Sequence, residues 1–199
     1  MTTTFLLIRH AAHGLLGRVL AGRTGGVHLS EEGRAQADRL AGRLGGEGIR
    51  LVQSSPMERA HETAAPIAAA LGLEVEVAPA LDEIDFGAWT GLGFDELDGD
   101  AGWTRWNTAR GFARPPEGES AVEVLARLLA HVEALRERHP DETVALVSHC
   151  DVIRALLLHA LGLPAEAYGR IEIAPASISR LVLGDWGARV EGLNERVGP

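Results

Sequence analysis

Two stretches decide the fold: residues 5–10, Phe5-Leu6-Leu7-Ile8-Arg9-His10, and residues 144–149, Val144-Ala145-Leu146-Val147-Ser148-His149. Each is a short apolar run that ends in a histidine, and such runs are typical of buried parallel strands. In open α/β sheets, ligands bind just beyond the carboxyl ends of the strands. We therefore expect both imidazoles to face one crevice, together with the guanidinium of Arg9.

The residue types at these strand ends suggest a chemistry. Guanidinium and imidazole groups donate hydrogen bonds and suit an oxyanion such as a phosphoryl group. This gives the hypothesis of phosphoryl chemistry on histidine. Taken alone, however, Arg9 beside His10 fits an ordinary ion-paired rim better, because paired charges are common outside active sites.

Length and composition limit the kinds of protein that this chain can be. It has 199 residues, of which 46% are hydrophobic and 24% charged, which suits one well-buried core. We expect a single domain over residues 1–199. No stretch approaches the twenty apolar residues of a membrane span, and the charged pair at Arg9 comes too early for a secretory signal. With a single cysteine, Cys150, these features predict a cytoplasmic protein without an internal disulfide.

Charge excludes further classes. The net charge of −9 disfavours nucleic acid and anionic membrane as partners. All 19 basic residues are arginine. Lysine-dependent chemistry, including Schiff bases and the lysine of a phosphate-binding P-loop, is therefore excluded.

Helix signals alternate with the apolar runs, which predicts βαβ units and an α/β fold with a mostly parallel sheet. Ser30 is expected to cap a helix that buries Leu40 and Leu44. A strand is expected at residues 51–53. Ser55 and Glu58 form a predicted capping box, with Pro56 at the first helical position, and this helix should run to Leu71 and stop at Gly72. Residues 74–77 alternate as a strand should.

The second half of the chain continues the pattern. Ser120 and Glu123 predict another capping box, and the long helix after it should end before Pro140. Four residues are expected on the buried face of that helix: Val122, Leu125, Leu129 and Val132. Residues 152–161 predict a buried helix, and residues 177–183 a late strand for which an edge position is one interpretation. Residues 11–29 and 85–117 lack periodicity and are candidates for the walls of the site.

The motifs of the chain follow the order of a known family. They are Arg9-His10-Ala11, Gly22-Arg23-Thr24, residues 29–37 (LSEEGRAQA), residues 54–64 (SSPMERAHETA), residues 81–89 (LDEIDFGAW), Glu117-Gly118-Glu119-Ser120 and Ser148-His149. Together they cover nearly the whole chain, which resembles the histidine phosphatase superfamily, the phosphoglycerate mutase-like group. The resemblance implies a three-layer α/β/α sandwich.

This resemblance also implies site residues. His10 would be the nucleophile that forms a phosphohistidine, and Arg9, Arg59 and His149 would surround the phosphoryl oxygens without a metal or other cofactor. Glu83 would be the general acid and then the general base.

Weaker implications concern substrate binding. Arg23 is expected to contact substrate, and the main-chain N–H of Cys150 to contact phosphate. The partner would be a small phosphorylated metabolite. The sequence indicates no oligomeric state. Arg105, Arg110 and Arg114 have no acidic neighbour in sequence, so they fit either a second anion-binding group or a solvated basic face.

Several positions depart from the family pattern. Ala11 replaces the usual glycine, and Ala12-His13 replaces a frequent Glu-Thr pair. Leu16 is at about the position where the family often has an asparagine that helps to hold phosphate, and Cys150-Asp151 replaces a common glycine pair. The grip on the phosphoryl group is therefore expected to differ. Phosphomonoester hydrolysis is the favoured function, because the compact chain lacks the extra sequence that similar mutases carry between acid and second histidine. A phosphoglycerate mutase-type phosphotransferase and a non-catalytic binder of phosphorylated ligands are the alternatives.

Overall fold

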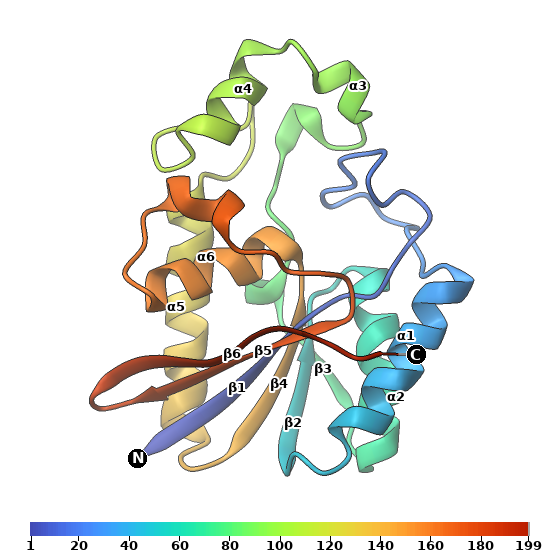
Figure 1. The fold of residues 1–199 in the computed structure, drawn as a ribbon, viewed down its shortest axis with the longest axis vertical. Coiled ribbons are helices and arrows are strands. Elements are labelled where there is room, and N and C mark those ends of the chain that lie inside the picture. The colour runs from blue at the N-terminus through green and yellow to red at the C-terminus, as the bar shows by residue number, and fades with distance from the viewer. Residues whose placement is uncertain (199) are drawn as a thin grey trace.

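A central sheet of six strands lies between two layers of helices in the computed structural model, which describes residues 1–198 (Figure 1). The strand order is β3-β2-β4-β1-β5-β6. The strands are β1 (Thr2–Arg9), β2 (Ile49–Ser54), β3 (Val75–Val77), β4 (Thr143–Ser148), β5 (Ser177–Gly184) and β6 (Gly187–Arg196). From β3 to β1 all neighbours are parallel, whereas β5 and β6 pair antiparallel. The predicted α/β sandwich with a mostly parallel sheet is confirmed.

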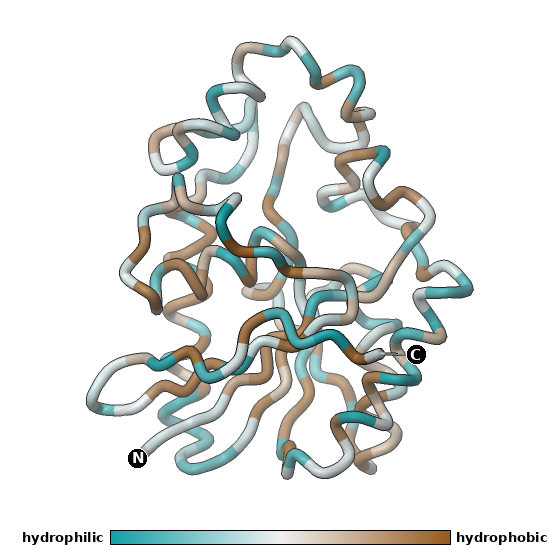
Figure 2. Tube along the Cα trace, in the orientation of Figure 1, coloured by the Kyte–Doolittle hydropathy of each residue, from teal (hydrophilic) through white to brown (hydrophobic). Residues whose placement is uncertain are grey.

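Alternate side chains of the central strands pack against different helices. Leu6 and Ile8 of β1 belong to a core cluster with α1 (Glu31–Leu44) and α2 (Glu58–Leu71). Phe5 and Leu7 belong to a second cluster with α5 (Ala121–Arg138) and α6 (Cys150–Ala160). Successive side chains of a strand point to opposite faces, so a strand covered on both sides must be apolar throughout. Figure 2 shows this concentration of hydrophobic residues along the strands.

Shorter helices complete the chain. They are η1 (Pro79–Leu81), η2 (Gly87–Trp89), α3 (Phe94–Leu97), α4 (Ala101–Thr108) and η3 (Ala165–Arg170). The α3–α4 segment stands beyond the carboxyl ends of the parallel strands, at the top of Figure 1. Trp89 of η2 and Trp106 of α4 are buried and belong to the core cluster that includes α5 and α6. Within residues 1–198, every helix is too short or too polar to span a bilayer.

The helix starts test the capping predictions. The Ser30 hydroxyl accepts a hydrogen bond from the N–H of Gly33 at 3.0 Å, and Ser120 and Glu123 form the predicted capping box. The start predicted at Ser55 is wrong, because α2 begins at Glu58 and its N-cap is Met57. The Ser55 hydroxyl accepts the N–H of Met57 at 3.2 Å and also contacts His149, at the end of β4. The predicted stop is confirmed at Gly72, which has a φ of 67°.

Two further expectations need correction. On α5, Val132 is buried as expected, Leu125 and Leu129 are half-buried, and Val122 is 62% exposed. The other buried residues of this helix are Val124, Leu128 and Leu135. Apolar residues extend around much of this helix, so sequence alone offers two stripes, and packing on the sheet selects the one that begins at Val124. The late strand is confirmed as β5, but it lies between β1 and β6 rather than at an edge. β6 itself is largely exposed and lacks an apolar pattern that would predict it.

Gly33 generates a prediction, because it brings α1 against the loop that follows β1. A β-carbon on Gly33 would lie 1.9 Å from the main-chain oxygen of Ala12, so the helix or the loop would have to move. We expect Gly33→Ala to lower the free energy of unfolding by about 2 kcal/mol or more. Urea denaturation measures this change.

Gly42 supplies the matched control in the same helix. A β-carbon there meets nothing within 4 Å. Gly42→Ala should therefore raise the free energy of unfolding by up to about 1 kcal/mol, since alanine is the better helix former. Equal stability of the two variants would contradict the close approach at Gly33.

Candidate active site

The parallel register brings the ends of three strands, β1, β2 and β4, to one edge of the sheet. Arg9 of β1 pairs with Ser148 of β4, and Ser54 of β2 pairs with Val147 of β4. Main-chain hydrogen bonds continue this alignment past the strand ends, from His10 N–H to Ser148 O and from Ser55 N–H to Val147 O, both at 2.9 Å. Because the strands end level, the residues that follow them must share one space.

His10 and His149 face each other in that space. Their ring centroids are 5.2 Å apart. Nδ1 of His10 lies 2.8 Å from the main-chain oxygen of Ala11, so Nδ1 carries the proton and Nε2 keeps its lone pair. Burial, and then the positive charges of Arg59 and Arg9, hold the pKa of His10 well below its usual value. His10 is therefore a neutral imidazole with a free nucleophilic nitrogen at neutral pH.

His149 is fixed by contacts on both ring nitrogens. Nε2 lies 2.7 Å from the Ser55 hydroxyl, and Nδ1 lies 3.3 Å from Nη2 of Arg59. Because a guanidinium only donates, Nδ1 accepts and Nε2–H donates to Ser55. The same Nδ1 lies 3.6 Å from Oε2 of Glu83. Burial lowers the pKa of His149 well below its usual value, with Arg59 adding to the effect.

The two arginines carry donors that no described residue accepts. Arg59, in the first turn of α2, is 1% exposed and donates from Nη2 to Gly22 O at 2.7 Å. Within residues 1–198 its buried Nε and Nη1 have no hydrogen-bond partner, and neither has the buried Nε of Arg9. Buried donors are nearly always satisfied in folded proteins. Their position beside two imidazoles suits the oxygens of a tetrahedral anion.

Glu83 supplies a carboxyl group to the same cluster. Its Oε1 accepts the N–H of Ile84 at 2.9 Å, and its side chain is 13% exposed. Burial raises the pKa of Glu83 to about 7, although the charges of Arg59 and Arg9 act in the opposite direction. A carboxyl group with this pKa can both give and take a proton near neutral pH.

Arg127 of α5 holds the segment that carries Glu83. Its guanidinium donates to the main-chain oxygens of Ala80, Asp82 and Glu83, at 2.5, 2.9 and 3.3 Å. It also forms an ion pair with Glu119 at 2.8 Å. Nothing in the local sequence singles out Arg127, because its partners lie far away along the chain.

Arg23 lies where it supports this segment rather than in the cleft. Nε donates to the main-chain oxygen of Glu83 at 2.8 Å, and the guanidinium forms ion pairs with Asp82, Asp85 and Glu119. Substrate contact by Arg23 stays a prediction that this placement does not support.

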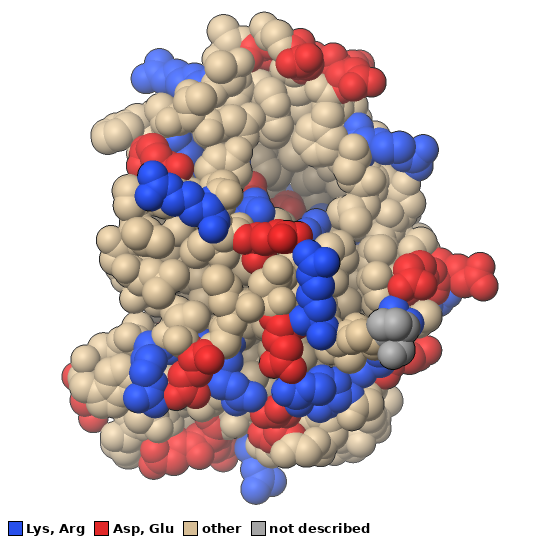
Figure 3. Space-filling view, viewed as in Figure 1, with Lys and Arg blue, Asp and Glu red and all other residues tan. Residues whose placement is uncertain are grey.

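A cleft with a volume of about 330 Å³ opens above the cluster. Arg9, His10, Arg59 and Glu83 line it. Of the two segments without periodicity, residues 11–29 supply most of the wall as expected, whereas residues 85–117 supply Phe94 alone among the lining residues. Figure 3 shows the molecule hollowed on this face, between the α3–α4 segment and the strand ends. Among residues 1–198, no group of three or more His, Cys, Asp or Glu side chains is arranged to hold a metal ion.

Sequence reasoning missed two residues of the site. Ser55 was interpreted as a helix cap, but it orients His149, and the capping signal concealed that role. His13, named from sequence only as a departure from the family pattern, lines the cleft with its ring centroid 5.2 Å from that of His10. Burial lowers the pKa of His13 to about 4, so its ring is neutral at neutral pH.

Cys150 is the first residue of α6, and its side chain is not among those that line the cleft. Sγ lies 3.6 Å from the main-chain oxygen of Ile173, and burial raises the pKa of the thiol. Its main-chain N–H belongs to the first turn of the helix, where N–H groups have no partner within the helix. Contact between that N–H and phosphate stays a prediction.

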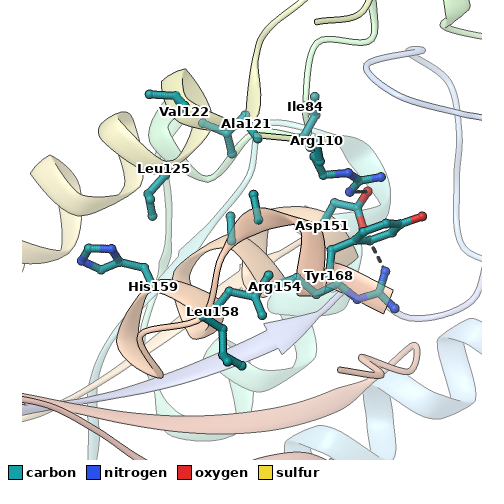
Figure 4. Close-up of a pocket in the computed structure, with 14 residues that line it drawn as sticks. Ile84, Arg110, Ala121, Val122, Leu125, Asp151, Arg154, Leu158, His159 and Tyr168 are labelled. Atoms are coloured by element: carbon teal, nitrogen blue, oxygen red, sulfur yellow. Dashed lines mark hydrogen bonds and ion pairs between the residues drawn. The ribbon is translucent and has the colours of Figure 1, made fainter. Parts of the chain in front are cut away.

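Two of the three arginines without acidic neighbours in sequence find acidic partners in space. Arg110 forms an ion pair with Asp151 at 2.7 Å, and Arg114 forms one with Glu123 at 2.7 Å. Figure 4 shows Asp151 between Arg110 and Arg154, beside the ring of Tyr168. Arg110 therefore connects the segment after α4 to the first turn of α6. Arg105 and Arg114 are both exposed.

Comparisons with known proteins agree with this geometry. The profile of the histidine phosphatase superfamily (branch 1) matches residues 5–196. Phosphoserine phosphatase 1 of Hydrogenobacter thermophilus is 34% identical over 153 residues, which cover 76% of this chain and 72% of that protein. The probable phosphoglycerate mutase GpmB of Yersinia pestis is 35% identical over 155 residues, which cover 77% of this chain and 72% of that protein.

Length and structure add two further comparisons. The bifunctional protein Rv2228c of Mycobacterium tuberculosis is 36% identical over 179 residues, which cover 89% of this chain but 49% of that protein. This chain thus spans about half the length of that relative. The structure of mycobacterial glucosyl-3-phosphoglycerate phosphatase Rv2419c matches with a TM-score of 0.88 at 29% identity, over 98% of this chain and 100% of that one.

The raised pKa of Glu83 predicts that the folded protein loses stability at pH values above the pKa that Glu83 has in the unfolded chain. The folded protein holds this proton up to about pH 7, whereas the unfolded chain loses it near pH 4.5, so stability falls as pH rises between these values. We expect the free energy of unfolding of Glu83→Gln, measured by urea denaturation, to exceed that of the wild type by on the order of 3 kcal/mol at pH 8. At pH 4.5 the difference should be much smaller. An advantage that is the same at both pH values would contradict the assigned pKa.

Proposed function

The chain belongs to the histidine phosphatase superfamily, branch 1, and we propose that it hydrolyses phosphate monoesters through a phosphohistidine formed on His10. One observation supports this proposal most directly. The hydrogen bond from Nδ1 of His10 to Ala11 leaves Nε2 unprotonated beside buried guanidinium donors without partners in residues 1–198. A nucleophile and an anion site therefore coincide.

The first step transfers the phosphoryl group to the protein. The lone pair of His10 Nε2 forms a bond to phosphorus while the bond from phosphorus to the ester oxygen breaks. The carboxylic acid of Glu83 gives its proton to that oxygen, and the alcohol leaves. A pKa of about 7 keeps a large fraction of Glu83 protonated at neutral pH.

The second step returns the protein to its starting state. The Glu83 carboxylate takes a proton from water, whose oxygen attacks phosphorus, and the bond between phosphorus and His10 breaks. Inorganic phosphate leaves, and Glu83 is again protonated. Splitting one displacement into two uses the same nucleophile and the same acid–base group twice.

Three cations or potential cations are proposed to bind the phosphoryl oxygens. Nε and Nη1 of Arg59 and Nε of Arg9 are available donors. An anion at the site favours protonation of His149 at Nδ1, which then donates to the anion in place of accepting from Arg59. Ser55 holds that ring in place through Nε2. Because these groups balance the charge of the phosphoryl group, we propose that the reaction needs no metal.

The remaining expectations stand as proposals. Residues 1–198 share one sheet and its two helix layers, which supports one domain. A cytoplasmic location is proposed from the sequence alone. The substrate is proposed to be a small phosphorylated metabolite, which fits a cleft of about 330 Å³.

Trapping the intermediate tests the nucleophile. Wild-type protein mixed with a ³²P-labelled aryl phosphate and quenched in denaturant should carry acid-labile, alkali-stable label, as a phosphoramidate does. His10→Ala should carry none, because Nε2 is removed. His61→Ala is the matched control, since His61 is exposed on α2, and should be labelled like the wild type. Label on His10→Ala, or none on wild type, would refute the assignment.

The same preparation separates the competing functions. In buffer with a chelator, labelled protein should release phosphate to water, and this release should match steady-state turnover. Transfer of label to 3-phosphoglycerate with little release would instead identify a mutase. Binding of phosphorylated ligands with neither label nor release would identify a non-catalytic binder.

Glu83 predicts the pH dependence of the first step. Because the leaving oxygen needs the protonated acid, kcat/KM for an alkyl phosphate should fall about tenfold per pH unit above pH 7. Glu83→Gln should lower kcat/KM by roughly 10²–10⁴ and lose this decline. An aryl phosphate, whose leaving group needs no proton, should show a much smaller loss. Unchanged decline in Glu83→Gln would contradict the role.

A further inference from the structure

We infer that the substrate is the phosphate monoester of an uncharged, apolar alcohol, an inference that rests on the proposed phosphatase function. Above the charged floor of the cleft, the wall is formed by Leu16, Val19, Leu20 and Phe94. We call these four residues the apolar wall. A leaving alcohol must lie against this wall while its phosphate is held at the floor.

The apolar wall is built to a fixed shape. Its two parts come from distant segments, yet main-chain hydrogen bonds join them: Leu20 N–H to Leu92 O at 2.9 Å, and Phe94 N–H to Arg18 O at 3.0 Å. A bridge between Val19 and Gly93 lies between these bonds. The wall is therefore formed by paired main chains rather than by a single free loop.

Part of the apolar wall is open to the cleft, although Leu20 also packs against a core cluster and the ring centroid of Phe94 lies 6.2 Å from that of Trp103. Leu16 and Phe94 are each 36% exposed and absent from both core clusters. Exposed apolar side chains grouped at a concave site favour an apolar ligand.

The charges around the cleft also favour an uncharged leaving alcohol. Arg9 and Arg59 line the floor of the cleft, where their positive charges are proposed to pair with the phosphoryl group. Arg23 is held by three carboxylates, and His13 is neutral because burial lowers its pKa to about 4. Arg18 donates to Gly14 within its own loop and does not line the cleft.

A second negative charge on the substrate would therefore meet a poor environment. Among the described residues that line the cleft, no further cation is left to pair with a carboxylate. A carboxylate placed against the apolar wall would lose hydration without gaining a partner. An alkyl or aryl group would instead gain from burial, by up to about fourfold in affinity for each methylene group removed from water.

A series of matched substrates tests this inference. Ethyl, butyl and hexyl phosphate have leaving alcohols of nearly equal reactivity, and 3-phosphonooxypropanoate matches butyl phosphate in chain length but ends in a carboxylate. We expect kcat/KM to rise at least tenfold from ethyl to hexyl phosphate. Butyl phosphate should exceed 3-phosphonooxypropanoate by at least tenfold.

The outcomes separate the two proposals. Phosphate release with a flat alkyl series, or with equal or faster turnover of the carboxylate, would overturn the substrate class and leave the phosphatase function standing. No release from any substrate, and no label on His10, would overturn the phosphatase function itself.

Variants connect the preference to the wall. Leu16→Asn and Phe94→Ser should each lower the ratio of hexyl to ethyl kcat/KM by about threefold or more. Phe112→Ser is the control, because Phe112 is 84% exposed and lies outside the residues that line the cleft. Its ratio should equal that of the wild type. Thermal denaturation verifies that each variant is folded, and an unchanged ratio in both folded wall variants would overturn the inference.

Discussion

The parallel hydrogen bonding of β1 with β4 is the constraint on which the site depends. Arg9 opposite Ser148 fixes where both strands end, and the following residues have no freedom to separate. The 5.2 Å between the imidazole centroids is thus a property of the sheet. β2 extends the same alignment to Ser55, whose hydroxyl orients the second imidazole. Reactive groups set on strand ends are held more firmly than groups on free loops.

Burial decides the protonation states in this cluster, even where charge opposes it. Neighbouring guanidinium groups favour an ionised Glu83, yet desolvation outweighs them and the pKa rises to about 7. For His10, desolvation and the guanidinium charges act together, and the ring stays neutral. One buried environment therefore holds both a neutral imidazole and a protonated carboxyl group, the two states that the proposed mechanism requires. Arg127 donates hydrogen bonds to the main-chain oxygens of Asp82 and Glu83, which holds the Glu83 segment in this environment.

Local signals predicted the elements well, whereas long-range requirements decided the details. The histidine-ended runs predicted the sheet and the shared crevice, and the caps at Ser30 and Ser120 were confirmed because capping depends on neighbours in sequence. The predicted start of α2 was wrong, and the local sequence gave no sign that the Ser55 hydroxyl contacts His149, which follows another strand. The ion pair of Arg110 with Asp151 was equally hidden, since no local pattern encodes a contact across the fold. The exposed strand β6 gave no signal, because an outer strand needs no apolar alternation.

The pairing of residues 18–20 with residues 92–94 has a consequence for how this protein can diversify. The groups proposed for chemistry belong to the strand ends and the segments directly after them, whereas the apolar wall belongs to two connections that lie outside the sheet. Selectivity can therefore evolve while the reactive centre is preserved. The two connections share main-chain hydrogen bonds, however, so an insertion in one must be matched by a compensating change in the other. Descendants with new preferences should consequently differ in both segments together.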